Sequence, residues 1–300
     1  MSSTLKTQPP ATKYLVLTYP TPEILLVRLN RPKSLNCISS EGNAELAELW
    51  QWYDAEPSLC VAIITGTGRA FCAGADLKGL SRLAHHTHST LHSDCPWTTL
   101  TDTTTEWNNS NSSNRSRPIG PMGFGSLSRR GGKKPIIAAV NGICFGGGCE
   151  MIVNADMVIA ARSAQFALPE VKRGVVAMAG ALPRIVRTIG RVRAMEMALT
   201  GRVVMAEEAE RWGLINRVVG DGEVVERAVE AAKSIAENSP DAVQVSREGI
   251  KLGWEGVGAE EGSRLLLENW YPRLQEGENL KEGVRAFVEK RKPKWKASKL

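Results

Sequence analysis

The sequence lacks several features that would assign it to a class at once. None of its apolar runs approaches the roughly 20 residues that a membrane-spanning helix needs. Its first residues, MSSTLKTQPPATKY, contain no apolar segment of the kind found in a secretory signal. The six cysteines form no C-x-x-C pair, so we expect reduced thiols rather than disulfides. We therefore expect neither membrane insertion nor secretion.

Common catalytic motifs are missing as well. There is no G-x-S-x-G elbow, and neither Gly-rich stretch is followed by the Lys-Ser/Thr of a phosphate loop or sits in a convincing dinucleotide fingerprint. All four histidines fall between positions 85 and 92. HHTH could ligate zinc, but only Asp94 and Cys95 could complete the set, and a solvated loop is the preferred interpretation. We predict no metal site.

What is present is typical of a large globular α/β protein. Of its 300 residues, 42% are hydrophobic and 23% are charged, enough for a sizeable core. YLVLTYPTPEILLVRLNRP predicts two short strands, NAELAELWQWY a helix, and VAIITGTG and PIIAAVNGICF one buried strand each. Beyond Ala206 the apolar residues recur at helical spacing. We predict an α/β core followed by a helical C-terminal region.

One long segment breaks this pattern. Between Ser81 and Lys134 the sequence is rich in Ser, Thr, Asn, Gly and Pro, with little periodic apolar character. Loops of this length are uncommon inside compact domains. We therefore predict a mobile insertion or flexible lid at about 81–134.

Two Gly-rich stretches stand at expected junctions between a strand and a helix. Gly146, Gly147 and Gly148 precede an apolar helix, whose first-turn N–H groups have no partner within the helix. GTGRAFCAGADLKGL has the same arrangement after an earlier strand. Each stretch could supply one N–H group to a single polarised carbonyl oxygen, although a lone Gly-rich turn is weak evidence.

Two glutamates accompany these glycines. Glu150 lies in the first turn of the expected helix, where the helix dipole alone would favour a carboxylate. Glu170 ends the apolar stretch QFALPE, where an unpaired buried carboxylate would be costly. The local sequence does not distinguish a helix-capping role of Glu150 from a catalytic one. Together, two carboxylates beside oxyanion donors suit general acid–base chemistry on water and a carbon acid.

The motifs taken in order resemble the crotonases, the enoyl-CoA hydratase/isomerase superfamily. The similar stretches are LNRPKSLN (29–36), GTGRAFCAGADLK (66–78), KKPIIAAVNGICFGGGCE (133–150), ADMVIAARSAQFALPEVKRG (155–174), AMEMALTGR (194–202), AERWGLINRV (209–218) and FVEKRKP (287–293). The resemblance implies an α/β fold, a crotonase-type spiral of ββα turns with a helical C-terminal trimerisation region. It places the spiral core at 13–225, the helical region at 226–292 and a basic tail at 293–300.

The resemblance also implies a site. The oxyanion hole would be the backbone N–H groups of Ala75 and Gly147, holding the thioester oxygen of an acyl-CoA, with Glu150 and Glu170 as catalytic residues. Glu150 would help deprotonate water as it attacks C3, and Glu170 would deliver a proton to C2. The residues implied for CoA binding are Ala73, Ala75, Asp76, Leu77, Lys78 and Lys290. No cofactor is implied beyond the CoA of the substrate, and a homotrimer or hexamer is expected.

The implied activity is that of an enoyl-CoA hydratase, which reversibly adds water to a trans-2-enoyl-CoA. The pathway could be fatty-acid β-oxidation or the tailoring of a specialised acyl chain, because VKRGVVAMAGALPR, with Met178 and Ala181, departs from typical short-chain hydratases. The alternatives are an enoyl-CoA isomerase that uses Glu170 alone and a crotonase-fold RNA-binding protein that uses its basic surface. The paired glutamates argue against both.

The C-terminal residues make a separate prediction. Ser298, Lys299 and Leu300 form the tripeptide that directs proteins to the peroxisome. The block from Lys290 carries six Lys or Arg and no acid. It could be a solvated basic tail, and it also suits recognition by an import receptor. We expect a peroxisomal location and no nucleic-acid partner.

Overall fold

The computed structural model describes residues 5–76 and 121–300, and within them the chain forms two sheets. The larger has six strands in the order β1-β2-β3-β5-β7-β10; only β1 and β2 pair antiparallel. Its strands are β1 (Leu15–Thr21), β2 (Ile24–Leu29), β3 (Val61–Gly66), β5 (Ile136–Val140), β7 (Met157–Ala161) and β10 (Arg217–Val219). Of the parallel strands, β2, β3, β5 and β7 are almost wholly apolar, as expected for strands covered on both faces.

The smaller sheet has the order β4-β6-β8-β9, with β4, β6 and β8 parallel and β9 antiparallel. Its strands are β4 (Ala70–Cys72), β6 (Ile143–Phe145), β8 (Gln165–Ala167) and β9 (Val204–Met205). The pairs β3/β4, β5/β6 and β7/β8 each give their first strand to the larger sheet and their second to the smaller one. This repetition is the predicted spiral. The single strand predicted for PIIAAVNGICF is therefore wrong: the chain changes sheet at Asn141-Gly142, where a Cβ on Gly142 would lie 2.1 Å from the Arg69 carbonyl oxygen.

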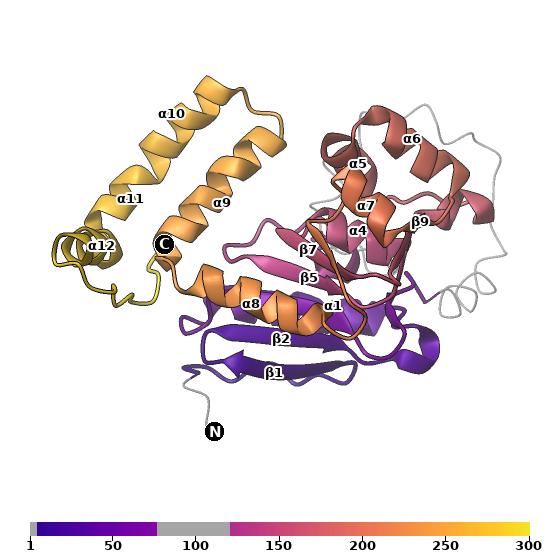
Figure 1. Cartoon of the computed structure of the whole chain (residues 1–300), viewed down its shortest axis with the longest axis horizontal. Coiled ribbons are helices and arrows are strands. Elements are labelled where there is room, and N and C mark those ends of the chain that lie inside the picture. The colour runs from indigo at the N-terminus through magenta and orange to yellow at the C-terminus, as the bar shows by residue number, and fades with distance from the viewer. Residues whose placement is uncertain (1–4, 77–120) are drawn as a thin grey trace, which may run out of the picture.

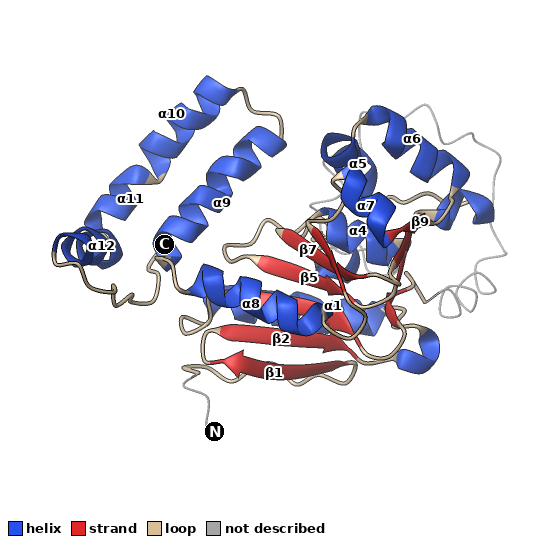
Figure 2. Ribbon diagram, in the orientation of Figure 1, coloured by secondary structure: helices blue, strands red, loops and turns tan. Residues whose placement is uncertain are grey.

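Helices cover these sheets, as Figure 2 shows. In the core they are α1 (Ser40–Ala55), α4 (Gly147–Val153), α5 (Ala181–Ile189), α6 (Arg191–Thr200), α7 (Ala206–Trp212) and α8 (Val224–Ala236). Short 3-10 helices span Pro32–Ser34, Phe124–Ser126 and Pro169–Arg173. α1 begins after Ser39, whose hydroxyl oxygen accepts a hydrogen bond from the N–H of Gly42. Serine is among the residues that most often cap a helix in this way.

The C-terminal region separates from the core after α8. α9 (Pro240–Trp254), α10 (Ala259–Asn269), α11 (Tyr271–Glu276) and α12 (Glu278–Val288) form a lobe to one side of the sheets (Figure 1). The expected boundary at 225/226 falls inside α8, whose Val224, Ala228 and Ala232 pack on the larger sheet. By packing, the separate helical region begins at α9, because the apolar face of α8 needs the sheet to cover it.

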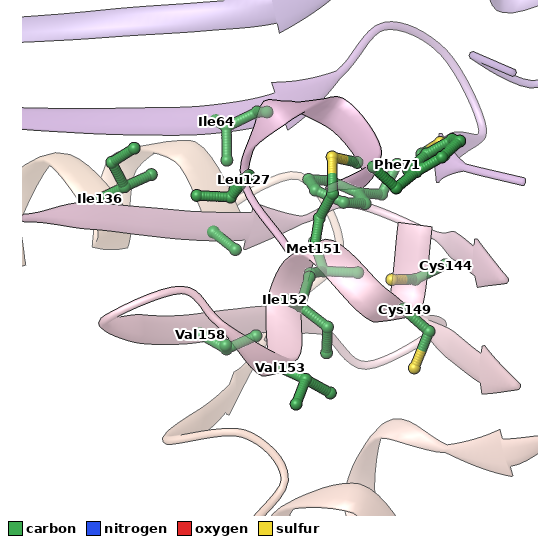
Figure 3. Close-up of a cluster of buried hydrophobic side chains, with 14 of the residues drawn as sticks. Ile64, Phe71, Leu127, Ile136, Cys144, Cys149, Met151, Ile152, Val153 and Val158 are labelled. Atoms are coloured by element: carbon green, nitrogen blue, oxygen red, sulfur yellow. The ribbon is translucent and has the colours of Figure 1, made fainter. Parts of the chain in front are cut away.

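The segment 121–134 corrects the predicted insertion. Leu127 is buried among side chains of β3, β5 and α4, including Ile64, Ile136 and Met151 (Figure 3). The Trp50 indole donates to the Gly125 carbonyl oxygen at 3.1 Å. This part of the predicted lid is therefore core, because its irregular backbone finds internal hydrogen-bond partners. The remainder, 81–120, lies outside the described residues.

The C-terminal tail runs back along the chain. The Trp295 indole donates to the Glu237 carbonyl oxygen at 2.7 Å, and buried Asn279 exchanges two hydrogen bonds with the backbone of Lys296. The Lys133 ammonium donates to the main-chain oxygen of Leu300 at 2.9 Å. The last residues thus lie in a groove between the end of α1, the end of α8 and the start of α9. In the part of the chain that the structure describes, no helix has the length and apolar character needed to cross a bilayer.

Candidate active site

Three consecutive glycines shape the start of α4, each for a different steric reason. Gly146 caps the helix with φ of 55°, a conformation that side chains disfavour. A Cβ on Gly147 would lie 2.5 Å from the Phe124 ring, and one on Gly148 would lie 2.2 Å from the Cys72 carbonyl oxygen. The glycines therefore allow the helix start to approach β4 and the 3-10 helix Phe124–Ser126 closely.

The two predicted oxyanion donors lie on neighbouring segments. A Cβ on Gly74 would be 3.4 Å from the Gly147 nitrogen, so the residue before Ala75 borders the start of α4. Ile38 holds the Ala75 segment by pairing with both Gly74 and Asp76 at 3.0 and 3.1 Å. Among the described residues, neither the Ala75 nor the Gly147 N–H has a hydrogen-bond acceptor. Two free donors in adjoining turns can bind one polarised oxygen.

Glu150 is buried at the first turn of α4, with 4% of its surface exposed. Its Oε2 accepts from the Ala181 N–H, at the start of α5, at 3.1 Å. Burial raises the pKa of Glu150 to about 7; the Ala181 N–H opposes the rise and the neighbouring Glu170 carboxylate adds to it. A carboxyl group with this pKa can either hold or release a proton near neutrality.

Glu170 approaches the same helix start from the 3-10 helix Pro169–Arg173. A Cβ on Gly146 would lie only 3.0 Å from Glu170 Oε1, so the carboxylate faces the glycine turn. Its Oε2 is buried and has no hydrogen-bond partner among the described residues. Burial raises the pKa of Glu170, although its own N–H and Arg173 oppose the shift. The unpartnered oxygen is available for a proton of a bound molecule.

The arrangement therefore combines two carboxyl groups with free N–H donors at one end of the smaller sheet. Because each carboxylate disfavours ionisation of the other, the pair retains a proton more readily than two separate carboxylates would. One group can act as acid while the other acts as base. The free N–H groups can stabilise negative charge on an oxygen bound between them. This is the chemistry of enolate formation with addition or loss of water.

The other predicted residues occupy varied positions. The Ala73 N–H donates to the Leu35 carbonyl oxygen, and Asp76 pairs with Arg31 at 2.8 Å, so Asp76 is not free to bind a ligand through its charge alone. Leu77 and Lys78 lie outside the described residues. Lys290 follows α12 in the exposed C-terminal region, with a positive φ of 54°.

Sequence reasoning missed the role of Ala181. Ala181 contributes its backbone N–H to Glu150, which no side-chain pattern could reveal. Met178, singled out with it, has 76% of its surface exposed. The four histidines lie outside the described residues. Within residues 5–76 and 121–300, no group of three or more His, Cys, Asp or Glu could hold a metal ion.

Comparisons with known proteins agree with this geometry. The sequence profile of the enoyl-CoA hydratase/isomerase family matches residues 21–106 and 128–298. A mevalonyl-coenzyme A hydratase of Aspergillus fumigatus is 49% identical over 97% of this chain and 98% of its own length. Another, from Beauveria bassiana, is 47% identical over 99% and 100%. The crystal structure of an enoyl-CoA hydratase from Mycobacterium tuberculosis superposes with a TM-score of 0.79 and 30% identity, covering 95% of this chain and 99% of that one.

Proposed function

The chain belongs to the enoyl-CoA hydratase/isomerase family and is a hydro-lyase of the enoyl-CoA hydratase type, and from this premise we propose that its substrate is mevalonyl-CoA. The observation that carries the proposal is the similarity to two mevalonyl-coenzyme A hydratases over almost the full length of all three chains. Mevalonyl-CoA carries a hydroxyl and a methyl group on C3 and a second hydroxyl on C5. Its dehydration gives the C2–C3 unsaturated thioester.

The proposed mechanism uses the four groups described above. The thioester oxygen lies between the N–H groups of Ala75 and Gly147. In the dehydration direction, ionised Glu170 takes the proton from C2, and the electrons of that bond form an enolate stabilised by the two N–H groups. As the electrons return to form the C2–C3 double bond, the C3–O bond breaks, and protonated Glu150 gives its proton to the leaving hydroxide, which departs as water.

The pKa of Glu150 supports this assignment of the proton. At about 7, it allows Glu150 to hold a proton near neutrality. Its protonated form is the one needed to expel a hydroxyl group. Hydration is the reverse, with Glu150 as base for water and Glu170 as acid toward C2, so the same pair serves both directions.

Substrate competition tests the proposal. Purified protein is given mevalonyl-CoA, 3-hydroxy-3-methylpentanoyl-CoA, which lacks only the C5 hydroxyl, and 3-hydroxybutyryl-CoA, which lacks the C3 methyl group and C5 altogether. Formation of the conjugated thioester is followed by absorbance and mass spectrometry. We expect kcat/KM to be highest for mevalonyl-CoA by about tenfold or more, because a site that binds a substrate hydroxyl discriminates strongly against its absence. A preference for 3-hydroxybutyryl-CoA would overturn the substrate proposal and leave the hydratase class intact.

The placement of CoA is a further part of the proposal. The segment Ala73–Lys78, including Ala75, Asp76, Leu77 and Lys78, would lie along the CoA moiety, and Lys290 would meet a CoA phosphate. The exposed position of Lys290 supports the second assignment, since a phosphate needs an accessible cation. Lys290→Gln should raise KM for the acyl-CoA and leave kcat nearly unchanged; Lys233→Gln, on the surface of α8, serves as control.

We also propose a homotrimer, or a hexamer of two trimers. Support comes from large apolar side chains that the single chain leaves exposed: Val192 and Leu199 on α6, Phe287 and Val288 on α12. Phe287 has 86% of its surface exposed. Large apolar side chains left exposed in this way are typical of subunit interfaces. Light scattering on the purified protein measures the mass directly, and a monomer would exclude the proposal.

For location, we propose the peroxisome, on the basis of the C-terminal Ser298, Lys299 and Leu300. In the folded chain Ser298 and Leu300 are half-buried and Lys299 pairs with Glu278 at 2.9 Å. An import receptor would have to displace these contacts. Fluorescence microscopy of an N-terminal fusion, with and without the tripeptide, tests the location; identical distributions would exclude it.

A further inference from the structure

The peptide unit between Gly180 and Ala181, at the start of α5, lies between Arg184 and Glu150 and bonds to both. Its N–H, that of Ala181, donates to Glu150 Oε2 at 3.1 Å. Its carbonyl oxygen, that of Gly180, accepts from Arg184 Nη1 at 3.1 Å. Because the peptide unit is planar, fixing the direction of the carbonyl also fixes the direction of the N–H. Arg184 and Glu150 thus form hydrogen bonds to opposite sides of the same planar peptide unit.

Arg184 is in turn held by the C-terminal lobe. Its Nη2 pairs with Glu255 Oε1 at 3.4 Å, and its guanidinium lies 5.8 Å from the centre of the Trp254 ring. Both residues are at the end of α9. Arg187, one turn further along α5, donates to the Trp254 carbonyl oxygen and has no bond to the Gly180 turn. The end of α9 is therefore joined to α5 by two arginines, of which one reaches the peptide that binds Glu150.

The turn has little room to adjust. Gly180 has φ of 123°, and a Cβ there would lie 2.7 Å from Arg129 Cγ and 3.0 Å from Arg184 Nη1. A charged donor on the carbonyl also polarises the peptide, so its N–H becomes a stronger donor toward the carboxylate. This polarisation depends on the guanidinium remaining where Trp254 and Glu255 hold it.

We propose that Arg184 is a positioning residue for Glu150, acting through the Gly180–Ala181 peptide, and that Trp254 and Glu255 at the end of α9 hold it in place. The proposal rests on the catalytic role proposed for Glu150. It extends that role by making proton transfer at Glu150 dependent on how the C-terminal lobe contacts α5.

Loss of the contact between Arg184 and the Gly180 carbonyl oxygen should shift the pKa of Glu150 in one direction. An N–H bonded to a carboxylate favours its ionised form, so weakening that bond raises the pKa of Glu150. The ionisable groups that face Glu150 are Glu170 from the 3-10 helix Pro169–Arg173 and the thiol of Cys149 on α4. β4 and β6 add the thiols of Cys72 and Cys144, whose pKa values burial raises, so neither bears charge near neutrality.

The experiment compares Arg184→Gln with Arg187→Gln. The substrate is the acyl-CoA that the wild type turns over fastest, and kcat and KM are measured from pH 5 to 9. For Arg184→Gln we expect kcat to fall about ten- to a hundred-fold with KM within about twofold, because misplacement of a catalytic group acts on the chemical step. The limb of the pH profile due to Glu150 should move upward by about half a unit or more. Arg187→Gln should stay within about twofold of wild type.

Three further variants make the outcomes distinguishable. Arg184→Lys, which keeps a charged donor, should recover most of the lost kcat, and Glu255→Gln should show the same upward shift of the limb to a smaller extent. If Glu150→Gln keeps full activity, the proposed role of Glu150 is wrong. If Glu150→Gln is inactive but Arg184→Gln retains kcat, or loses kcat and thermal stability without any shift of the limb, Arg184 is a structural residue only and the inference is overturned.

Discussion

Glu56 and Glu150 are two glutamates with almost no exposed surface, 0% and 4%. Their surroundings shift the pKa of the carboxyl group in opposite directions. Five donors meet Glu56: the N–H and hydroxyl of Ser58, the N–H and hydroxyl of Thr7, and the N–H of Lys6. Burial raises the pKa of Glu56, but these bonds outweigh it and bring the pKa down to about 2. This carboxylate stays ionised throughout the physiological range.

The Glu150 carboxylate accepts far fewer hydrogen bonds than that of Glu56. The Ala181 N–H donates to it at 3.1 Å, the backbones of Ala179 and Gly180 contribute less, a second carboxylate faces it, and its pKa rises to about 7. The contrast teaches that burial alone does not identify a catalytic acid. A buried carboxylate with a full set of donors stabilises the fold, whereas one left short of donors is held ready to exchange a proton.

The sharpest test of this contrast removes the charge at the site. Glu150→Gln and Glu170→Gln should each lower kcat for hydration by about a hundred- to ten-thousand-fold, the usual contribution of a general acid or base. Both proteins should remain folded by circular dichroism. If Glu150→Gln loses hydration but still shifts a double bond from C3 to C2, Glu170 alone supports isomerisation. Full hydratase activity in both variants would contradict the site.

A second test addresses the oxyanion donors. Gly147→Ala places a Cβ 2.5 Å from the Phe124 ring, so the start of α4 must move and its N–H with it. We expect kcat to fall about a hundred- to a thousand-fold, as for loss of one oxyanion donor. The matched control is Gly253→Ala in α9, where a Cβ meets nothing within 4 Å. There activity should be unchanged and the helix should gain up to about 1 kcal/mol. Equal activities in the two variants would contradict the assignment.

A third test applies the same substitution to the saturated carboxylate. Glu56→Gln leaves several donors without their charged acceptor, and we expect the free energy of unfolding to fall by about 2–4 kcal/mol. Measured below the unfolding transition, kcat should equal that of wild type. Urea unfolding gives the first quantity and steady-state kinetics the second. A selective loss of kcat without loss of stability would reverse our assignment of the two glutamates.

The smallest effect concerns pH and stability. The folded-state pKa of Glu150, about 7, exceeds its unfolded value of 4.5, so its contribution to stability is complete below pH 4.5 and is lost as the pH rises through 7. Glu56 has the opposite sign: its contribution is complete above pH 4.5 and is lost as the pH falls toward 2. Glu150→Gln should therefore be more stable than wild type by about 1–3 kcal/mol at pH 8 and by progressively less toward pH 4.5. A constant difference across that range would refute the shift.

Much of the fold could be predicted because its signals are local. β3 is a continuous apolar run ended by glycine, and α1 has helical spacing behind a Ser cap. The change of sheet at Asn141-Gly142 could not be predicted, since the decisive contact is with the Arg69 carbonyl oxygen, far away in sequence. The core position of 121–134 was hidden for a related reason. Its polar, Gly-rich sequence predicts a loop, and only Trp50, Asn154 and other distant partners make its backbone suitable for burial.

In the candidate site, too, the sequence predicts some features and not others. Glu150 and Glu170 could be singled out because a carboxylate next to glycines and apolar residues is unusual in any sequence. The contacts that set their chemistry could not be predicted, because they come from backbone groups: the Ala181 N–H on Glu150 and the Gly146 turn beneath Glu170. A backbone donor leaves no mark in the identity of its residue. The contacts of Arg184 with Trp254 and Glu255 are likewise visible only when α5 and α9 are seen together.

The docked C-terminal tail has a consequence for sorting. If an import receptor reads Ser298, Lys299 and Leu300, as we propose, it can bind only the fraction of chains whose tail is detached. The apparent dissociation constant then rises in inverse proportion to that fraction, about tenfold for each 1.4 kcal/mol by which Asn279, Trp295 and Lys133 hold the tail. Chains in which the C-terminal helices have not yet closed on the tail would be captured first. The same hydrogen bonds that finish the fold thus compete with delivery of the protein.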